Sequence, residues 1–312
     1  MTKSDFKVKF WGTRGSYPVA NKEFLKYGGN TSCVEVNAGN HRIILDGGTG
    51  IIGLGDKIYK EHISSAENVF DRTPMNIIVL LSHVHQDHIQ GLNFFKPINV
   101  LTTKFSLFGY SGFDSNLGET LSELIYGKSF PINLYDITAD CVIEDITESE
   151  IIIIDNEKEM PYVKRITDVE DIKPLKDEII ISFLKSNSHP NFGVMCFKIS
   201  YKNKSVVYAT DTECYSGGSK RLELFAKDTD LLIHDSQYTT EDYLSSVMPK
   251  QGFGHSTFYM AYNVAKSANA KKLAFFHFDP SYNDEKLTNI EKRFKNKSNK
   301  CFLAREGMEI CI

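Results

Sequence analysis

The chain has 312 residues, of which 41% are hydrophobic and 24% are charged, and its formal net charge is −4. This length permits a sizeable buried core, and the small excess of acidic groups argues against unspecific binding of nucleic acid. No apolar run reaches the length of a signal-peptide core or a membrane span, and the six cysteines form no CxxC pair, so we expect a cytoplasmic protein with reduced thiols and no membrane contact.

The first part of the chain has the patterns of a sheet followed by a helix. Residues 7–11 alternate between polar and apolar and end at a glycine-rich turn. Residues 31–36 and 42–46 predict the two strands of a hairpin. Residues 51–62 predict a helix, and the apolar, β-branched run 76–81 predicts a buried strand.

The middle of the chain, residues 97–180, is the least regular part. Residues 118–126 predict a short helix, and residues 151–154 and 178–183 predict strands. The mixed charges of residues 157–177 predict an exposed loop.

The second half repeats the strand-rich pattern. We predict strands at residues 194–201, 205–209, 231–233 and 272–276, and helices at 256–267 and 287–294. Two β-rich halves, each with late helices, predict a layered α/β sandwich.

A cluster of potential metal ligands directly follows the predicted strand 76–81. It contains His83, His85, Asp87 and His88 within six residues. Loops after strands commonly hold catalytic groups on a rigid scaffold. Imidazole nitrogens and a carboxylate at such short spacing are the ligands that a zinc-type cation needs.

Three further candidates, His189, Asp211 and His277, each follow a predicted strand. Strands that end in the same direction place these residues along one edge, near the first cluster. Seven ligands exceed the about four of one tetrahedral zinc ion, and they suit two ions about 3.5–4 Å apart with Asp211 as the bridge. The many histidines argue against Mg²⁺ and Ca²⁺. We therefore expect two divalent ions, Zn²⁺ first, with Mn²⁺ or Fe²⁺ as alternatives.

The glycine-rich turns of the first half leave alternatives open. Asp46, in the turn 46–50, lies either in a tight turn only or close to the metal site as well. Arg14 and Asn30 either approach a substrate phosphate or stabilise their own turns by hydrogen bonds.

The pattern of these candidates resembles the metallo-β-lactamase superfamily. Seven further segments resemble its phosphodiesterase branch, namely residues 11–16, 27–33, 45–50, 209–213, 232–238, 252–257 and 275–280. That branch includes tRNA 3′-processing endonucleases and phosphodiesterases of cyclic nucleotides and small cyclic phosphates. The similarity covers nearly the whole chain except residues 100–180.

The resemblance implies a four-layer αββα sandwich of the α/β class. It implies one domain over residues 1–312 with a variable insert around 100–180. The implied ligands form two sets that share Asp211 as the bridge: His83, His85 and His189 in one, and Asp87, His88 and His277 in the other. Asp46 is expected to support the site by a hydrogen bond to a ligand histidine.

The resemblance also implies catalytic roles for His255 and Asp235. In the endonuclease relatives, the histidine that matches His255 is paired with an acid and assists the scissile phosphate; Asp235 matches that acid, where those enzymes usually have Glu. A histidinium can donate to a phosphate oxygen or protonate the departing alkoxide. The alternative for His255 is a residue at a helix N-terminus. Asp87 is expected near the nucleophile and is the third catalytic candidate.

The leading hypothesis is hydrolysis of a small or cyclic phosphodiester, such as a cyclic nucleotide or a cyclic sugar phosphate, by a hydroxide held on the metal ions. The main alternative is tRNA 3′ processing. Those enzymes carry a long arm between the positions that match His189 and Asp211, where this chain has 21 residues, and the acidic net charge also makes nucleic acid the less favoured partner.

Two further alternatives come from other classes. A lactone or β-lactam hydrolase has no need of His255. A non-catalytic module that binds a nucleotide would have lost ligands, and all seven are present. The resemblance also implies a homodimer, with residues 100–180 as the expected contact.

Overall fold

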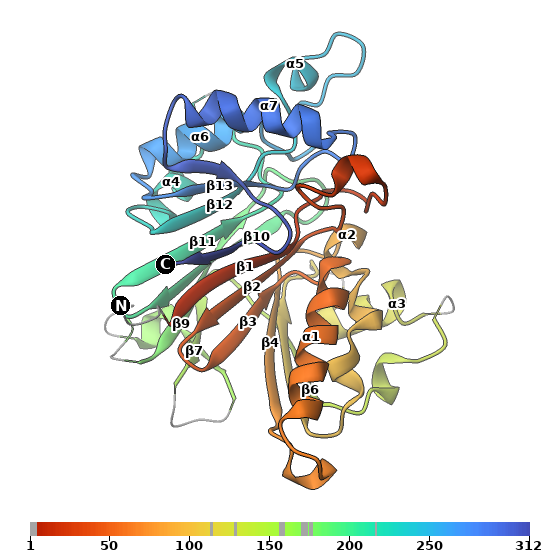
Figure 1. Ribbon diagram of the computed structural model, residues 1–312. Helices are drawn as coiled ribbons and strands as arrows, with labels where there is room; N and C mark the ends of the chain where they lie inside the picture. The colour runs from red at the N-terminus through yellow and green to blue at the C-terminus, as the bar shows by residue number, and fades with distance from the viewer. Residues whose placement is uncertain are drawn as a thin grey trace.

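The computed structural model describes residues 5–112, 115–127, 130–155, 160–169, 174, 177–215 and 217–312. Two mixed sheets pack face to face, and helices cover both outer faces (Figure 1). The expected αββα sandwich is therefore confirmed.

The first sheet is antiparallel where it begins and parallel from β3 onward. Its strands, in spatial order, are β15 (Glu309–Cys311), β1 (Phe6–Gly12), β2 (Cys33–Ala38), β3 (His41–Leu45), β4 (Met75–Leu81), β5 (Thr103–Gly109) and β6 (Asp140–Asp145).

The second sheet is parallel at one end and antiparallel at the other. Its strands, in spatial order, are β14 (Cys301–Leu303), β13 (Leu273–Phe276), β12 (Leu231–Asp235), β11 (Lys204–Ala209), β10 (Val194–Tyr201), β9 (Ile179–Ser186), β7 (Glu150–Ile154) and β8 (Tyr162–Arg165).

Helices on the outside complete the four layers (Figure 1). The α-helices are α1 (Gly50–Ser64), α2 (Gln86–Ile89), α3 (Leu117–Leu124), α4 (Lys220–Phe225), α5 (Thr240–Tyr243), α6 (Phe258–Ser267) and α7 (Asp284–Lys295). Short 3₁₀ turns lie at η1 (Lys22–Phe24), η2 (Val69–Asp71), η3 (Leu92–Phe94), η4 (Lys96–Asn99), η5 (Leu134–Asp136) and η6 (Ile166–Asp168). The buried faces of α1 and α3 pack on the first sheet, and those of α4, α6 and α7 pack on the second.

The main core lies between the sheets and is rich in aromatic rings. On β1, every second residue is buried, so that Phe10 points to the second sheet, where its ring lies 6.1 Å from that of Phe276. Phe197 stacks on Tyr208 with ring centroids 6.1 Å apart, and Tyr208 contacts Phe276. These rings hold the two sheets at a fixed separation beneath the loops of one edge.

We expect Phe197→Ala to lower the free energy of unfolding by about 3–5 kcal/mol, because Phe197 is 1% exposed and its loss leaves a cavity between the sheets. Denaturant unfolding measures the change. Phe70→Ala is the control, because Phe70 is 94% exposed. Equal stability of the two variants would contradict the assignment of Phe197 to the core.

The structure confirms the predicted strands and helices and adds strands that the sequence did not predict. One prediction is partly wrong: within the expected loop 157–177, residues 162–165 form the edge strand β8, which pairs with β7. Charged side chains are common on edge strands because they discourage pairing with other chains, and here they hide the strand pattern. Residues 157–159, 170–173 and 175–176 of that expected loop lie outside the described residues.

The cysteines are free thiols, as expected. Cys141 is half-buried and Cys311 is exposed, while the other four are buried. Among the described residues, no helix has the length and apolar character that crossing a bilayer requires.

Candidate metal centre

The candidate ligands lie at one edge of the sandwich, where strand ends of both sheets meet. In the first sheet, β4 ends at Leu81, and α2 then carries Asp87 and His88. In the second sheet, β11, β12 and β13 run parallel, so that Asp211 and His277 follow carboxyl ends at the same edge. Ligands of open α/β sheets commonly bind outside such carboxyl ends.

The backbone is bent sharply at three of these strand ends. Asp46, Asp211 and His277 have φ values of 62°, 51° and 63°. These values lie in the left-handed region, which residues other than glycine seldom adopt. Such conformations cost about 1–3 kcal/mol each and cluster at functional sites. Here the bends turn the three side chains toward the interior of the edge, where they meet the other candidates.

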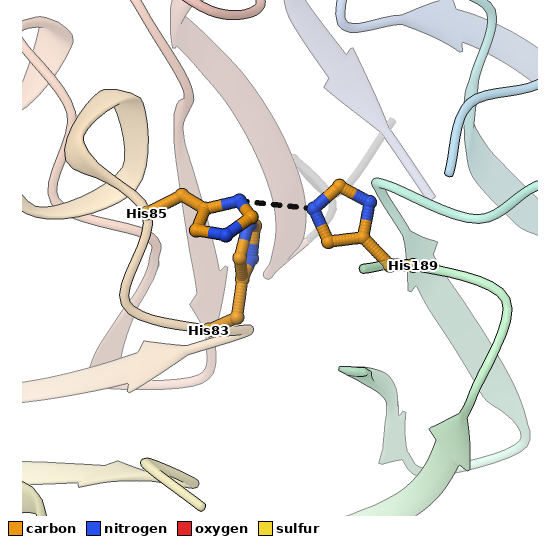
Figure 2. Close-up of side chains that lie close together, drawn as sticks. All are labelled: His83, His85 and His189. Atoms are coloured by element: carbon orange, nitrogen blue, oxygen red, sulfur yellow. Dashed lines mark hydrogen bonds between the residues drawn. The ribbon is translucent and has the colours of Figure 1, made fainter. Parts of the chain in front are cut away.

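His83, His85 and His189 form the first group (Figure 2). His83 and His85 follow β4, and His189 reaches them from the loop between β9 and β10. The Nδ1 of His85 lies 3.0 Å from the Nε2 of His189, and the ring of His83 lies 4.5 Å from that of His85 and 4.8 Å from that of His189. The three rings thus turn nitrogen atoms toward one common point.

Asp87, His88 and His277 form the second group. The Oδ2 of Asp87 lies 3.3 Å from the Nε2 of His88 and 3.1 Å from the Nε2 of His277. The two Nε2 atoms lie 3.3 Å apart. The three ligand atoms therefore form a nearly equilateral triangle.

Asp211 stands between the two groups. Its Oδ1 faces the second group, 3.2 Å from the Nε2 of His88 and 3.3 Å from that of His277. Its Oδ2 faces the first group, 3.8 Å from the Nε2 of His83 and 3.7 Å from that of His189. One oxygen per group is the arrangement that a bridging carboxylate needs.

These residues fit divalent metal ions. In a tetrahedral site with bonds of about 2.0–2.1 Å, neighbouring ligand atoms lie about 3.3 Å apart, close to the separations just given. The Nε2 of His83 is buried and has no hydrogen-bond partner within the described part of the chain, which leaves its lone pair for a ligand. The donor set fits zinc-type cations without selecting one of them.

The protonation states also suit metal binding. Burial, together with the charge of His88, holds the pKa of His83 well below its usual value. Burial likewise lowers the pKa of His189 to about 4. Burial alone would raise the pKa of Asp211, but the charges of His277 and His88 hold it well below its usual value. Neutral imidazoles and an ionised carboxylate are the forms that bind metal. His88 differs, because burial alone would lower its pKa but the neighbouring carboxylates hold it well above its usual value, so His88 would release a proton when a metal binds.

Asp46 supports His88 from the side away from the centre. Its Oδ2 accepts a hydrogen bond from the Nδ1 of His88 at 2.7 Å and another from the Tyr208 hydroxyl at 2.7 Å. The amide and hydroxyl of Ser82 donate to the same carboxylate. This fixes the His88 tautomer with Nε2 free. Of the two alternatives left open for Asp46, the structure supports a position close to the candidate metal site.

We expect Asp46→Asn to weaken metal binding about 10–100-fold, because an amide nitrogen cannot accept the donors that converge on this carboxylate. Titration of the metal-free protein against a chelating indicator measures the affinity. Asp230→Asn is the matched control, since Asp230 accepts from the Ser205 amide at the opposite end of the strands. An unchanged affinity in Asp46→Asn would show that His88 needs no such partner.

The motif at residues 11–16 places backbone groups against the second group. A Cβ on Gly15 would lie 2.4 Å from the ring of His277, so only glycine leaves room for it. The Ser16 amide donates to the Oδ2 of Asp87 at 2.6 Å. The sequence did not reveal this contact, because a backbone donor has no residue-type signature.

Arg14 and Asn30 hold their own turns. Arg14 is fully buried, and its Nε and Nη1 donate to the carbonyl oxygens of Gly28 and Tyr282. The Nδ2 of Asn30 donates to Glu306. Of the two roles left open for these residues, the structure supports the stabilising one.

His255 and Asp235 form a pair beside the two groups. The Nδ1 of His255 donates to the Oδ2 of Asp235 at 2.7 Å, and the amides of Ser256 and Gln237 donate to the Oδ1 of Asp235. Burial lowers the pKa of His255, but Asp235 outweighs this and raises it to about 9. Thr257, not His255, caps α6. His255 can therefore present a proton on Nε2 at neutral pH.

Comparisons with known proteins agree with this geometry. The Beta-lactamase superfamily domain matches residues 41–278. A curated relative, Ribonuclease Z of Picrophilus torridus, is 26% identical over 333 aligned positions, which cover 99% of this chain and 96% of the relative. Further curated relatives, between 22% and 28% identical, carry the same name.

Solved structures of low sequence identity share the fold. The metallo-beta-lactamase fold protein YhfI from Bacillus subtilis is 19% identical and superimposes with a TM-score of 0.63, covering 98% of each chain. A diphosphatase from the PhnP family is 12% identical with the same TM-score, covering 98% of this chain and 97% of that one.

Proposed function

Because the chain belongs to the metallo-β-lactamase superfamily, in its phosphodiesterase branch, and is a metal-dependent hydrolase, we propose that it cleaves phosphodiesters at a centre of two divalent ions. The observation that carries this proposal is the His255–Asp235 pair, 2.7 Å from nitrogen to oxygen, beside Asp211. A departing alkoxide needs a proton, and a buried histidinium held by a carboxylate supplies one.

The chain's residues divide the work as follows. His83, His85 and His189 would hold one ion, Asp87, His88 and His277 the other, and Asp211 would bridge them. Bound there, two such ions would supply an acidified water as the nucleophile and would neutralise charge on the phosphoryl oxygens. Asp87, fixed by the Ser16 amide, orients the attacking water. His255 donates its Nε2 proton to the leaving oxygen, and Asp235 keeps the imidazole oriented and favours its charged form.

RNA is the first substrate class that we propose. The names of the curated relatives support it, over nearly the full length of both chains. These names favour tRNA 3′ processing, the main alternative hypothesis, over hydrolysis of a small cyclic phosphodiester, the leading hypothesis. RNA bound here would be held without a protruding arm, because the segment between His189 and Asp211 consists mainly of β10 and β11, joined by a turn at Lys202 and Asn203.

A small phosphodiester is the second candidate, and that same short hairpin favours it. An RNA substrate needs contacts beyond the scissile phosphate, and these usually come from basic surfaces. A cyclic nucleotide or cyclic sugar phosphate is small enough to need contacts only close to the ions.

A substrate panel decides between the two. The metal-loaded protein is incubated with a precursor tRNA that has a 3′ extension, a single-stranded RNA, 2′,3′- and 3′,5′-cyclic nucleotides, a cyclic ribose phosphate and a lactone, and products are read by mass spectrometry. We expect cleavage of the precursor tRNA. Cleavage of cyclic phosphates alone would favour the second candidate, and cleavage of the lactone alone would refute phosphodiester hydrolysis.

We also propose a homodimer with residues 100–180 at or near the contact. Sedimentation equilibrium of the purified protein tests this, and a monomer at micromolar concentration would contradict it.

A further inference from the structure

Glu213 is a buried acid two residues after Asp211 that has no role in the mechanism above. Its side chain is enclosed, with the residue 2% exposed. Its carboxylate accepts hydrogen bonds from the Tyr243 hydroxyl at 2.5 Å, from the Gly252 amide at 2.9 and 3.0 Å, and from the Gly254 amide at 2.9 Å. These partners are neutral donors: Tyr243 ends α5, and the two glycines lie on the loop that follows it. Two of the three donors are therefore backbone amides of that loop.

That loop ends at His255, and the two glycines fix its course. Gly252 and Gly254 have φ values of 83° and 87°, which other residues seldom adopt. A Cβ on Gly254 would lie 2.2 Å from the Nδ1 of His189. The carbonyl oxygen of Gly254 lies 3.3 Å from that nitrogen and can accept a hydrogen bond from it. The position of Gly254 therefore affects both His189 and the adjacent His255.

The two segments are also joined along their backbones. The Glu213 amide donates to the Ser188 hydroxyl at 3.0 Å, next to His189. The Cys214 amide donates to the Ser256 hydroxyl at 3.0 Å, and that hydroxyl donates to the carbonyl of Thr212 at 2.5 Å. These hydrogen bonds join the loop that follows Asp211 to the loops around His189 and His255.

We infer that Glu213 is a positioning residue: through Gly252 and Gly254 it places His255 for proton transfer to the leaving oxygen, and it holds the Gly254 carbonyl against His189. This rests on the proposed phosphodiesterase function. A carboxylate is needed because its two oxygens can accept from several donors at once, whereas a glutamine has one accepting oxygen. Burying it is tolerated only because those donors compensate.

The test uses two phosphodiesters that differ in leaving group, at saturating metal. The leaving group of a dinucleotide or RNA is an alkoxide, which needs a proton to depart. The leaving group of bis(p-nitrophenyl) phosphate is a stable phenolate, which does not. We expect Glu213→Gln to slow the alkoxide substrate about tenfold or more and bis(p-nitrophenyl) phosphate less than about twofold. The double variant with His255→Ala should be no slower than His255→Ala alone.

A control and a second measurement keep the test decisive. Glu35→Gln removes another buried carboxylate, bonded to Trp11 and Arg42, and should show no leaving-group effect. Hydrogen exchange of the amides of Gly252 and Gly254 should be faster in Glu213→Gln than in the wild type and unchanged in Glu35→Gln. This readout needs no activity.

Separate outcomes would overturn the two ideas. If the wild type cleaves neither phosphodiester, the proposed function fails while the exchange result still judges Glu213. If the wild type cleaves both, an equal loss on both substrates, additive losses in the double variant, or unchanged exchange in Glu213→Gln would each overturn the role of Glu213.

Discussion

Replacing Asp211 by alanine is expected to abolish hydrolysis, with the rate falling by about 10³-fold or more, because the ions supply both the nucleophile and the charge neutralisation. The two oxygens of Asp211 face different ligand groups. Its loss removes a ligand from each ion and leaves their positive charges without the anion between them. We therefore expect the metal content to fall below two ions per chain, measured by plasma mass spectrometry after dialysis.

Folding must be separated from metal loss in this experiment. Asp211 has φ 51°, which alanine tolerates poorly and asparagine tolerates well, so Asp211→Asn is the second variant. It keeps the shape and removes the charge. Two retained ions together with a rate within about tenfold of the wild type in both variants would refute the bridging role.

The fold was predictable where one face of a strand is buried and the pattern is regular. β10 was predicted with its observed bounds, because its eight residues are mostly apolar and buried. β6 and β8 were missed, since both lie at sheet edges and carry charged residues. β15 was missed because three residues are too few to show a period. These elements depend on tertiary pairing that local sequence does not encode.

The site was predictable to the extent that its chemistry is carried by side chains. The seven ligand candidates follow strands and are histidines and aspartates, so they could be proposed before their distances were known. Two hydrogen-bonded contacts could not be predicted: that of the Ser16 amide with Asp87, and those of Glu213 with two glycine amides. Both involve backbone amides, which every residue type except proline has. Substrate preference is harder still to predict, since a pair of metal ions can act on any phosphodiester that reaches it.

His255→Ala is expected to give the second large effect, a loss of about 10²–10⁴-fold on substrates with an alkoxide leaving group. Because Nδ1 is committed to Asp235, Nε2 would be the proton donor in the proposed mechanism, and the His255 pKa of about 9 keeps the ring charged at neutral pH. Bis(p-nitrophenyl) phosphate should lose far less, because its leaving group departs without a proton. Comparing kcat on the two substrates measures the proton's contribution.

The matched control is His62→Gln. His62 is also buried, near the end of α1, and its Nδ1 lies 2.9 Å from the carbonyl oxygen of Thr73, with no hydrogen bond to a candidate ligand within the described part of the chain. This variant should show the wild-type ratio of the two rates. His255→Ala should keep two ions per chain, because His255 lies beside both ligand groups and belongs to neither. Equal losses on both substrates would instead assign His255 to charge stabilisation on the phosphoryl oxygens, a contribution that does not depend on the leaving group.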